Sequence, residues 1–293
     1  MKPTPFTYHV PNTIDQAARI LGSDPENSRV LAGGQSLVSM LNLRLVTVGN
    51  LIDINRIPGL DYVRVEAGGV IVGALARHND VESSHEVRRA LPLLTSALSH
   101  VAHSQIRNRG TIVGSLCHAD PAAELPAVWL ALDGELTAQS EGGTRTIRAD
   151  EFFISSFTTT LEPNEVVTEV RFSGTTGATG WSFEEVTKRH GDFALAGVVT
   201  LVTLKNGAVS SARIVPFGVG SKPIRITSAE QQLLGVSASA IDDALLDQVA
   251  AAVSAAVDPA NDIHASEEYR RHVAGVLTRR GLRRAIDDAQ QRA

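Results

Sequence analysis

The sequence predicts an α+β protein built from two or three packed modules. A chain of 293 residues can bury roughly three quarters of the surface of its unfolded state, which is enough for more than one core. In the first half, short apolar strands alternate with helix-like stretches, whereas a glycine-rich link at 173–180 precedes three strands and two alanine-rich helices. This link is the clearest boundary, and we expect domains at 1–58, 59–174 and 175–293.

The first domain is predicted to be a small α/β unit. A helix over 11–22 has a capped start and ends at a glycine, and a short strand at 29–31 follows it. After a Gly-Gly turn we expect a helix over 37–45 and then a buried strand at 50–54. This order would place the turn at the end of one strand of a small sheet.

The second domain is predicted to contain a hairpin, and the third to be a sheet covered by helices. β-branched residues on either side of Ala67-Gly68 indicate the hairpin strands. The other elements expected in the second domain are helices at 79–89, 92–101 and 125–132 and strands at 135–139, 144–147 and 166–172. Those expected in the third are strands at 181–186, 196–204 and 209–216 and helices at 240–257 and 267–290.

Composition excludes several classes of protein. The net charge is −5 and no run of Lys or Arg exceeds a pair, so we expect no nucleic-acid partner. No stretch has the apolar length of a signal peptide or of a transmembrane helix, and we expect a cytoplasmic protein. Neither a zinc-protease pattern nor a Rossmann or P-loop fingerprint is present, so a nucleotide would have to be held in another way.

The chain has a single cysteine, Cys117. One thiol cannot form an internal disulfide, and an iron–sulfur cluster needs about four protein ligands. Any cluster that works with this chain must therefore lie on another subunit.

Two adjacent glycines follow the strand at 29–31, in the segment Leu31-Ala32-Gly33-Gly34-Gln35-Ser36-Leu37. Glycine allows positive φ and leaves no Cβ between the main chain and a bound group. Successive N–H groups in such a turn can converge on an anion, and the following helix start and the Ser36 hydroxyl can add to the site. The segment is a candidate diphosphate cradle, although ordinary turn chemistry explains the same residues.

A second glycine-bearing segment covers 106–116 and continues into 117–126. Its small residues would let a flat ring or a ribityl chain lie close to the backbone, and Asp120 and Glu124 could accept hydrogen bonds from ligand hydroxyls. The alternative is a Thr/Ser-capped turn in which Glu124 favours the N-terminus of a helix.

Six segments in this order resemble the flavoprotein (medium) subunits of the molybdenum hydroxylases, which include carbon monoxide dehydrogenase medium subunits and the FAD domains of xanthine dehydrogenases. The resemblance spans nearly the whole chain, and the segments are 32–37, 51–54, 106–115, 118–126, 191–196 and 266–271. It implies a two-subdomain FAD-binding domain of the vanillyl-alcohol-oxidase type, followed by a C-terminal α/β domain with a three-stranded sheet and helices.

The resemblance also implies non-covalent FAD, with the first loop around the diphosphate and the second along the ribityl chain and the flavin. The cofactor-binding residues that it implies are Arg29, Leu31, Ala32, Gly33, Gly34, Gln35, Ser36, Leu37, Val101, Ala102, Thr111, Gly114, Ser115, Ala119, Asp120, Glu124, Leu161, Glu185 and Phe193. It implies no catalytic side chain and no metal ligand in this chain, because the redox chemistry belongs to the cofactor.

Three positions depart from the family pattern. Glu124 stands where some relatives have Asp, and Glu185 stands where relatives often have a lysine, with Lys188 as the nearest cation in the sequence. Phe193 stands where some relatives have Tyr, which removes a hydroxyl, and an ordinary core aromatic is the alternative there.

The family reaction is a hydroxylation with water as the oxygen source, carried out at a molybdopterin cofactor on a large subunit. Electrons then pass through the [2Fe–2S] clusters of a small subunit to FAD and on to an external acceptor. The resemblance implies that this chain supplies only the FAD stage, in a heterohexamer with two copies of each subunit that could also contact the inner face of the membrane. The substrate (carbon monoxide, a purine, an N-heteroaromatic or an aldehyde) and the acceptor stay open, and a stand-alone FAD-dependent oxidase or reductase of the same fold is the alternative.

Overall fold

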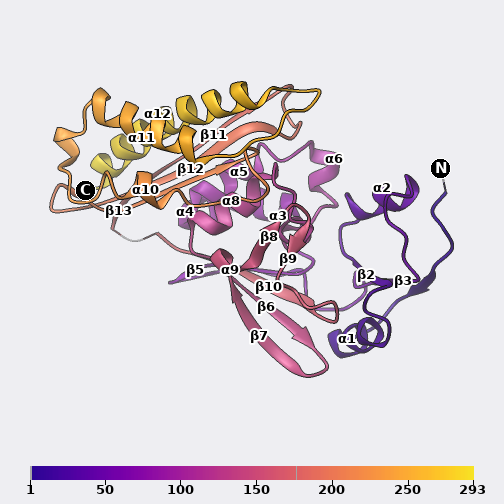
Figure 1. Ribbon diagram of the computed structural model, residues 1–293. Coiled ribbons are helices and arrows are strands. Elements are labelled where there is room, and N and C mark those ends of the chain that lie inside the picture. The colour runs from indigo at the N-terminus through magenta and orange to yellow at the C-terminus, as the bar shows by residue number, and fades with distance from the viewer. Residues whose placement is uncertain (1, 176) are drawn as a thin grey trace.

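The computed structural model describes residues 2–175 and 177–293, which fold around three sheets and one short two-stranded ribbon (Figure 1). The first sheet is parallel, with β3 between β1 and β2. Its elements are β1 (Thr7–His9), α1 (Ile14–Ser23), β2 (Ser28–Leu31), α2 (Leu37–Asn42) and β3 (Asn50–Asp53). The predicted helix over 37–45 is too long, because Arg44 has a φ of 58°, a left-handed conformation in which an α-helix cannot continue.

The second sheet is antiparallel, in the order β4-β5-β10-β6-β7. Its strands are β4 (Val63–Glu66), β5 (Gly69–Gly73), β6 (Glu135–Ser140), β7 (Gly143–Arg148) and β10 (Val166–Ser173). The elements that accompany it are α3 (His78–Ser83), α4 (His85–Ala90), α5 (Pro92–Leu98), α6 (Ser104–Arg107), α7 (Ile112–His118), α8 (Glu124–Ala131), α9 (Ala149–Phe152), β8 (Phe153–Ser155) and β9 (Thr158–Thr159).

Two expectations for this region are wrong. The single helix expected at 79–89 is divided at Ser84, whose ψ of 116° is extended and whose hydroxyl accepts a hydrogen bond from Val87 N to start α4. The helix expected at 92–101 ends at Leu98. Local propensity did not reveal that a serine would cap a new helix.

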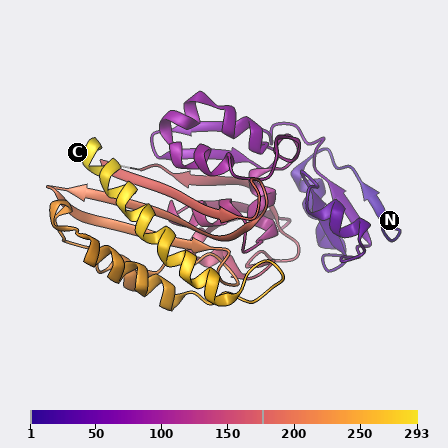
Figure 2. The same ribbon diagram turned by 90° about the horizontal axis from the view of Figure 1, so that it is seen from above.

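The third sheet is antiparallel, in the order β11-β12-β13, and α11 and α12 cover one of its faces (Figure 2). Its elements are β11 (Ala178–Thr187), β12 (Ala194–Lys205), β13 (Ala208–Phe217), α10 (Thr227–Glu230), a 3-10 turn (Ala238–Ala240), α11 (Asp243–Ala256) and α12 (Glu267–Arg292). The predicted α+β class, with a three-stranded C-terminal sheet, is confirmed. The exact division at residues 58 and 174 stays a prediction.

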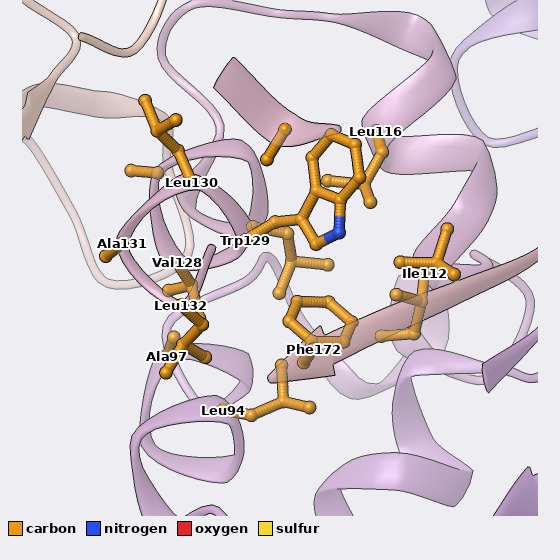
Figure 3. Packing of buried hydrophobic residues seen from close by; sticks show 14 of the residues in the cluster. Leu94, Ala97, Ile112, Leu116, Val128, Trp129, Leu130, Ala131, Leu132 and Phe172 are labelled. Carbon is orange, nitrogen blue, oxygen red and sulfur yellow. The ribbon is translucent and has the colours of Figure 1, made fainter. Parts of the chain in front are cut away.

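A continuous core joins the second sheet to the third. Trp129 on α8 is fully buried and lies in the same cluster as Leu116 and Phe172 (Figure 3). It packs edge-on against Phe152 and Phe153 and donates from Nε1 to the Arg171 carbonyl at 3.0 Å. The same apolar cluster includes Val199 and Phe217 of the third sheet. The opposite face of that sheet packs on α11 and α12 in a second cluster. Because β12 is covered on both sides, it is almost continuously apolar.

In the described part of the chain, no helix combines the length and the apolar character needed to cross a bilayer.

Candidate cofactor-binding site

The two glycine segments that lie far apart in the sequence are in direct contact in the fold. A Cβ added at Gly33 would lie 2.5 Å from the Arg109 carbonyl oxygen and 2.8 Å from Gly110 Cα. Gly33 is therefore required because the second loop lies against it, and not only because a phosphate approaches. Gly34 has the positive φ that the sequence suggested, at 74°.

The first loop presents a series of free donors. Among the residues that the structure describes, none of the backbone N–H groups of residues 32–36 donates a hydrogen bond to another protein group. Since backbone N–H groups are normally paired, five successive unpaired donors need an external partner, either water or an anion. Ser36 precedes α2 and makes no side-chain capping bond, so its hydroxyl is also free. The six-residue α2 is too short to contribute much dipole, and the loop amides are the main donors.

Asn55 and Arg77 form a hydrogen-bonded bridge between the carbonyl groups of the two loops. Asn55 Nδ2 donates to the Ala32 carbonyl at 2.8 Å, and Arg77 Nη1 donates to the Arg109 carbonyl at 2.6 Å. Arg77 Nη2 also donates to Asn55 Oδ1 at 2.7 Å, which closes the bridge. Because these carbonyls are hydrogen-bonded to the same bridge, the two loops keep a fixed separation and register.

Neither Asn55 nor Arg77 was predicted from the sequence. Asn55 directly follows the strand segment 51–54 that carries part of the family resemblance, and this position is the only signal that could have found it. Arg77 lies 22 residues further on and has no local signal, because its partners come from three separate segments. Both side chains also line a hollow of about 330 Å³.

The second segment is partly helical, as the capped-turn alternative predicted. Thr111 is the N-cap of α7 and accepts a hydrogen bond from Gly114 N at 3.1 Å. A Cβ on Gly114 would lie 2.6 Å from Thr111 Oγ1, so glycine permits this cap. Gly114 and Ser115 therefore lie in the first turn of a helix and not in an extended loop. His78 lies beneath Gly110, and burial lowers its pKa to about 4, so the ring is neutral.

The turn that precedes β12 in the C-terminal domain contacts residues 102–103, just before the second segment. A Cβ on Gly191, whose φ is 85°, would lie 2.9 Å from the Ala102 carbonyl oxygen and 2.7 Å from His103 Cε1. Phe193, two residues later, is 60% exposed. The alternative that Phe193 is a core aromatic is therefore wrong, and an exposed ring next to this contact is available to a ligand.

Residues 119–124 form another part of the same region. Ala119 has a φ of 52°, its carbonyl accepts from Phe157 N at 2.9 Å, and Asp120 Oδ1 accepts from Ala122 N at 2.9 Å. Glu124 begins α8 and is only 3% exposed. Leu161 is half-buried against the main core.

Glu124 and Glu185 are close enough to repel each other. Burial raises the pKa of Glu124 to about 7, and burial together with the charge of Glu124 raises that of Glu185 to about 8. In the described residues, no ion pair involves Glu185, and its Oε2 is buried without a hydrogen-bond partner. Within residues 2–175 and 177–293, Lys188, the nearest cation in the sequence, has no ion pair with either carboxyl.

The remaining predicted residues have different surroundings. Arg29 bonds the carbonyls of Glu26 and Ser28 at the start of β2, whereas the glycine turn follows the end of that strand. Leu31 and Leu37 pack in a small core under the turn. Val101 is buried in the main core next to Ala102, which has a positive φ of 45°. The assignment of all these residues to a cofactor stays a prediction.

An extended anionic nucleotide fits this arrangement. Free amides gather at the first loop and the second segment touches it, and the exposed Phe193 ring and the buried Glu185 Oε2 lie on the C-terminal domain. The thiol of Cys117 lies nearby on α7, and burial raises its pKa to about 12, so it stays protonated.

Comparison with known proteins agrees with this geometry. Residues 4–172 match the family model described as the FAD binding domain in molybdopterin dehydrogenase, and residues 181–285 match the CO dehydrogenase flavoprotein C-terminal domain. The chain is 42% identical to 6-hydroxypseudooxynicotine dehydrogenase complex subunit alpha of Paenarthrobacter nicotinovorans, over 99% of this chain and 97% of that one. It is 36% identical to the carbon monoxide dehydrogenase medium chain of Hydrogenophaga pseudoflava, over 97% of this chain and 98% of that one.

Solved structures show the same fold. Carbon monoxide dehydrogenase from Hydrogenophaga pseudoflava superposes with a TM-score of 0.94 at 36% identity, covering 98% of this chain and 99% of that one. Quinoline 2-oxidoreductase from Pseudomonas putida 86 gives a TM-score of 0.92 at 32% identity, covering 99% of each chain. The chain therefore belongs to the family of FAD-binding medium subunits of the molybdopterin dehydrogenases, and it is an oxidoreductase subunit with FAD as its cofactor.

Proposed function

We propose that this chain is the electron-transfer subunit of a molybdenum-containing hydroxylase, in which electrons from a partner's [2Fe–2S] clusters pass through FAD to an external acceptor. The observation that carries the proposal is a complete FAD-binding domain in a chain with one cysteine. Bound FAD supplies the redox chemistry, because a flavin can take up two electrons and release them to an acceptor. The chain's own residues bind and orient it and add no catalytic acid or base.

The loops and the C-terminal domain have separate tasks in this proposal. The free amides of residues 32–36 neutralise the diphosphate, and the bridge through Asn55 and Arg77 keeps the loops in register. Phe193 is exposed beside the second segment, where it can pack on the flavin ring. Residues 32–36, 101–102, 111–115, 119–124, 161, 185 and 193 would together surround a non-covalent FAD.

Substrate specificity is expected to lie outside this chain. Relatives that match over nearly their whole length are named for a hydroxypseudooxynicotine, for carbon monoxide and for caffeine, which have little chemistry in common. A medium subunit that matches over its whole length across these names is not expected to be the part that recognises the substrate. We therefore propose partners of two kinds, a large molybdopterin subunit and a small [2Fe–2S] subunit, in a heterohexamer with two copies of each chain.

The proposal is tested by producing the chain alone and together with its two partner subunits. We expect both preparations to be yellow, with flavin that acid precipitation releases into solution. With a substrate, the complex should reduce an external acceptor, whereas the chain alone should show only weak diaphorase activity. Native mass measurement gives the stoichiometry.

A variant that binds FAD more weakly makes the test specific to the relay. At FAD concentrations that no longer fill its site, a complex with Gly33→Ala should still reduce its iron–sulfur clusters with substrate but should lose transfer to the acceptor. If the chain alone oxidises a substrate at a useful rate, or if the flavin stays with the acid pellet, the stand-alone oxidase alternative replaces the proposal.

A further inference from the structure

The segment 266–271, one of the six that carry the family resemblance, has no part in the cofactor site described above. It contains two successive arginines, Arg270 and Arg271, in the first turns of α12. Arg270 is only 7% exposed. Burying a guanidinium costs solvation free energy, so its hydrogen-bond partners must offset that cost.

The Arg270 guanidinium connects three parts of the C-terminal domain. Its Nη1 donates to the Leu195 carbonyl at 2.7 Å and to the Gly218 carbonyl at 3.2 Å. Its Nη2 donates to Asp262 Oδ2 at 2.6 Å. The Asp262 carboxylate is itself fixed, because its Oδ1 accepts from two backbone N–H groups of the loop before α12. The start of α12 is thereby bonded to the beginning of β12 and to the residue that follows β13.

Leu195 lies at a β-bulge. The register of β11 and β12 shifts between Val186 and Thr187, so in the described part of the chain Leu195 has no opposite residue on β11. The pairing of β12 with β13 begins only at Gly197. A bulge redirects the side chains next to it and is common beside functional sites. Arg270 therefore holds the main chain of β12 at a residue with which neither neighbouring strand pairs.

Phe193 lies between two fixed points of the chain. On one side Gly191, whose φ is 85°, is so close to the FAD-binding domain that a Cβ there would lie 2.9 Å from the Ala102 carbonyl oxygen. On the other side the Leu195 carbonyl is bonded to Arg270. A short segment that is held at both ends leaves the side chain at its centre little freedom, although this ring is 60% exposed.

Gly218, which accepts from Arg270, also contacts the FAD-binding domain. Its N–H donates to the carbonyl of Pro121, in the predicted site segment 119–124, at 2.8 Å. A Cβ on Gly218 would lie 3.0 Å from the Ala194 carbonyl oxygen, so this glycine also lies close to the first residue of β12. The hydrogen bonds of Arg270 and Gly218 therefore join the beginning of β12 to the FAD-binding domain.

We propose that Arg270 is a positioning residue for Phe193: it fixes the beginning of β12 and thereby the direction in which the exposed ring points toward a bound flavin. It acts on the main chain at Leu195 and Gly218, and not on the cofactor itself. The part of this inference that concerns the flavin rests on the cofactor site proposed above, whereas the anchoring of residues 191–195 does not.

Arg271 offers a matched control, because its guanidinium binds carbonyl groups in another part of the domain. Its Nη1 donates to the carbonyls of Ser254, at 3.0 Å, and Val257, and its Nη2 donates to Glu267 at 2.8 Å. The two carbonyls lie at the C-terminal end of α11. Lysine keeps the charge at either position, but a single ammonium cannot reproduce the bonds of a planar guanidinium. Arg271→Lys should therefore affect α12 without releasing Leu195.

Chymotrypsin cleavage of the flavin-free full chain measures the anchoring. The protease cuts after aromatic residues, and the bond after Phe193 becomes accessible when the beginning of β12 opens. We expect cleavage there to be about threefold to tenfold faster in Arg270→Lys, the change that the loss of one hydrogen bond gives. Arg271→Lys should be cut at the rate of the unchanged chain.

Phe157 provides an internal reference in the same digest. It is 57% exposed between β8 and β9, and its N–H is bonded to the Ala119 carbonyl. Cleavage after Phe157 should be equal in all three chains, whereas a general loss of stability would raise it too. Equal cleavage after Phe193 in Arg270→Lys and in the unchanged chain would refute the anchor.

A double-mutant cycle tests the link to the flavin. The dissociation constant of FAD is measured for the unchanged chain, Arg270→Lys, Phe193→Ala and the double variant. Each single substitution should weaken binding by about threefold to tenfold, as expected for the loss of one aromatic contact. The double variant should bind no more weakly than Phe193→Ala, because Arg270 acts through that ring. The visible circular dichroism of the bound flavin should change in the same way in both single variants and stay unchanged in Arg271→Lys.

The two measurements separate this inference from the function proposed above. If cleavage after Phe193 rises in Arg270→Lys but no chain binds FAD, the cofactor site is wrong and the anchor stands. If FAD binds and the losses in the cycle simply add, the cofactor site stands and the positioning role is refuted. If Arg270→Lys does not fold, Asp262→Asn replaces it, because this change removes the charged group that orients the guanidinium. Asp262→Asn should then show both effects in the same direction, and the absence of both would refute the inference.

Discussion

At the scale of single residues, the candidate site depends on how closely two stretches of main chain can approach. Gly33 is almost in contact with the Arg109 carbonyl, and Gly114 makes room for the Thr111 cap. The sequence identified both glycines correctly as special, but it suggested a ligand as the reason at Gly33. The contact with Arg109 arises between segments about 75 residues apart, and no local pattern contains that information.

Replacing Gly33 with alanine should separate the two loops. Its Cβ would meet backbone atoms at 2.5 and 2.8 Å, and neither atom can rotate away. We expect a loss of stability of about 1–3 kcal/mol, as for other overpacked positions. FAD binding should weaken at least about tenfold. Calorimetry and flavin titration measure the two effects.

Gly142→Ala is the matched control for this substitution. Gly142 lies in the turn between β6 and β7, and the nearest atom to an added Cβ is a serine hydroxyl at 3.5 Å. This variant should keep the stability and the FAD affinity of the unchanged chain. Equal FAD affinity in the Gly33→Ala and Gly142→Ala chains would contradict the loop contact as part of the site.

Arg77→Lys should weaken FAD binding without removing a charge. The guanidinium reaches both Asn55 and the Arg109 carbonyl, and a single ammonium cannot make both bonds in that geometry. Since hydrogen bonds to charged groups contribute about 1.5–3 kcal/mol, we expect a several-fold to hundredfold rise in the FAD dissociation constant. Arg89→Lys, at an exposed position on α4, is the control and should bind as before. If Arg77→Lys binds FAD with an unchanged dissociation constant, the bridge is not part of the cofactor site.

At the scale of elements, the long helices and strands could be predicted and the short ones could not. The strand expected at 196–204 is β12 within two residues at its start and one at its end, because a strand covered on both faces is uniformly apolar. The last helix differs from its prediction only at its end, Arg292. By contrast α6 and α7 were not predicted, because α6 has only four residues and the seven residues of α7 depend on the Thr111 cap.

The end of the link at 173–180 shows how a glycine can mislead a prediction from sequence. The sequence suggested a glycine-rich connection through Gly180, but β11 already begins at Ala178. A Cβ on Gly180 would lie 2.0 Å from the Ala285 carbonyl oxygen and 2.3 Å from Ala289 N. Gly180 is therefore a packing glycine that lets α12 lie directly on β11, and its role depends on a helix about a hundred residues later.

Gly180→Ala should lift α12 from the sheet. We expect a loss of stability of about 3 kcal/mol or more, because backbone atoms of the helix cannot yield as a side chain could. Flavin affinity at a temperature where the chain is folded should change much less than in Gly33→Ala. Gly220→Ala is the control, since an added Cβ there would meet its nearest atom at 3.8 Å. Unchanged thermal stability of Gly180→Ala would contradict this packing.

At the scale of the whole molecule, the candidate site is made by parts from all three sheets. The first loop follows β2, the second leads into α7, and Glu185 and Phe193 come from the third sheet and the turn after β11. The sequence could indicate the separate segments through their resemblance to a family. It could not show that the first two touch.

FAD binding should therefore protect segments in both domains at once. In hydrogen exchange, the amides of residues 32–36 should exchange quickly without FAD, because they have no protein partner, and slowly with it. Residues 110–124 and 185–193 should slow down in the same experiment. Protection limited to the first 60 residues would show that the C-terminal domain does not take part.

The unpaired amides of the first loop have a practical consequence. Five adjacent donors recognise negative charge and geometry, and they do not distinguish a flavin nucleotide from a smaller oxyanion. Pyrophosphate, and more weakly inorganic phosphate, should therefore compete with the cofactor for the empty chain. Refolding or reconstitution in a phosphate buffer would then give a lower apparent yield of yellow protein than the same procedure in an amine buffer with chloride as its only anion.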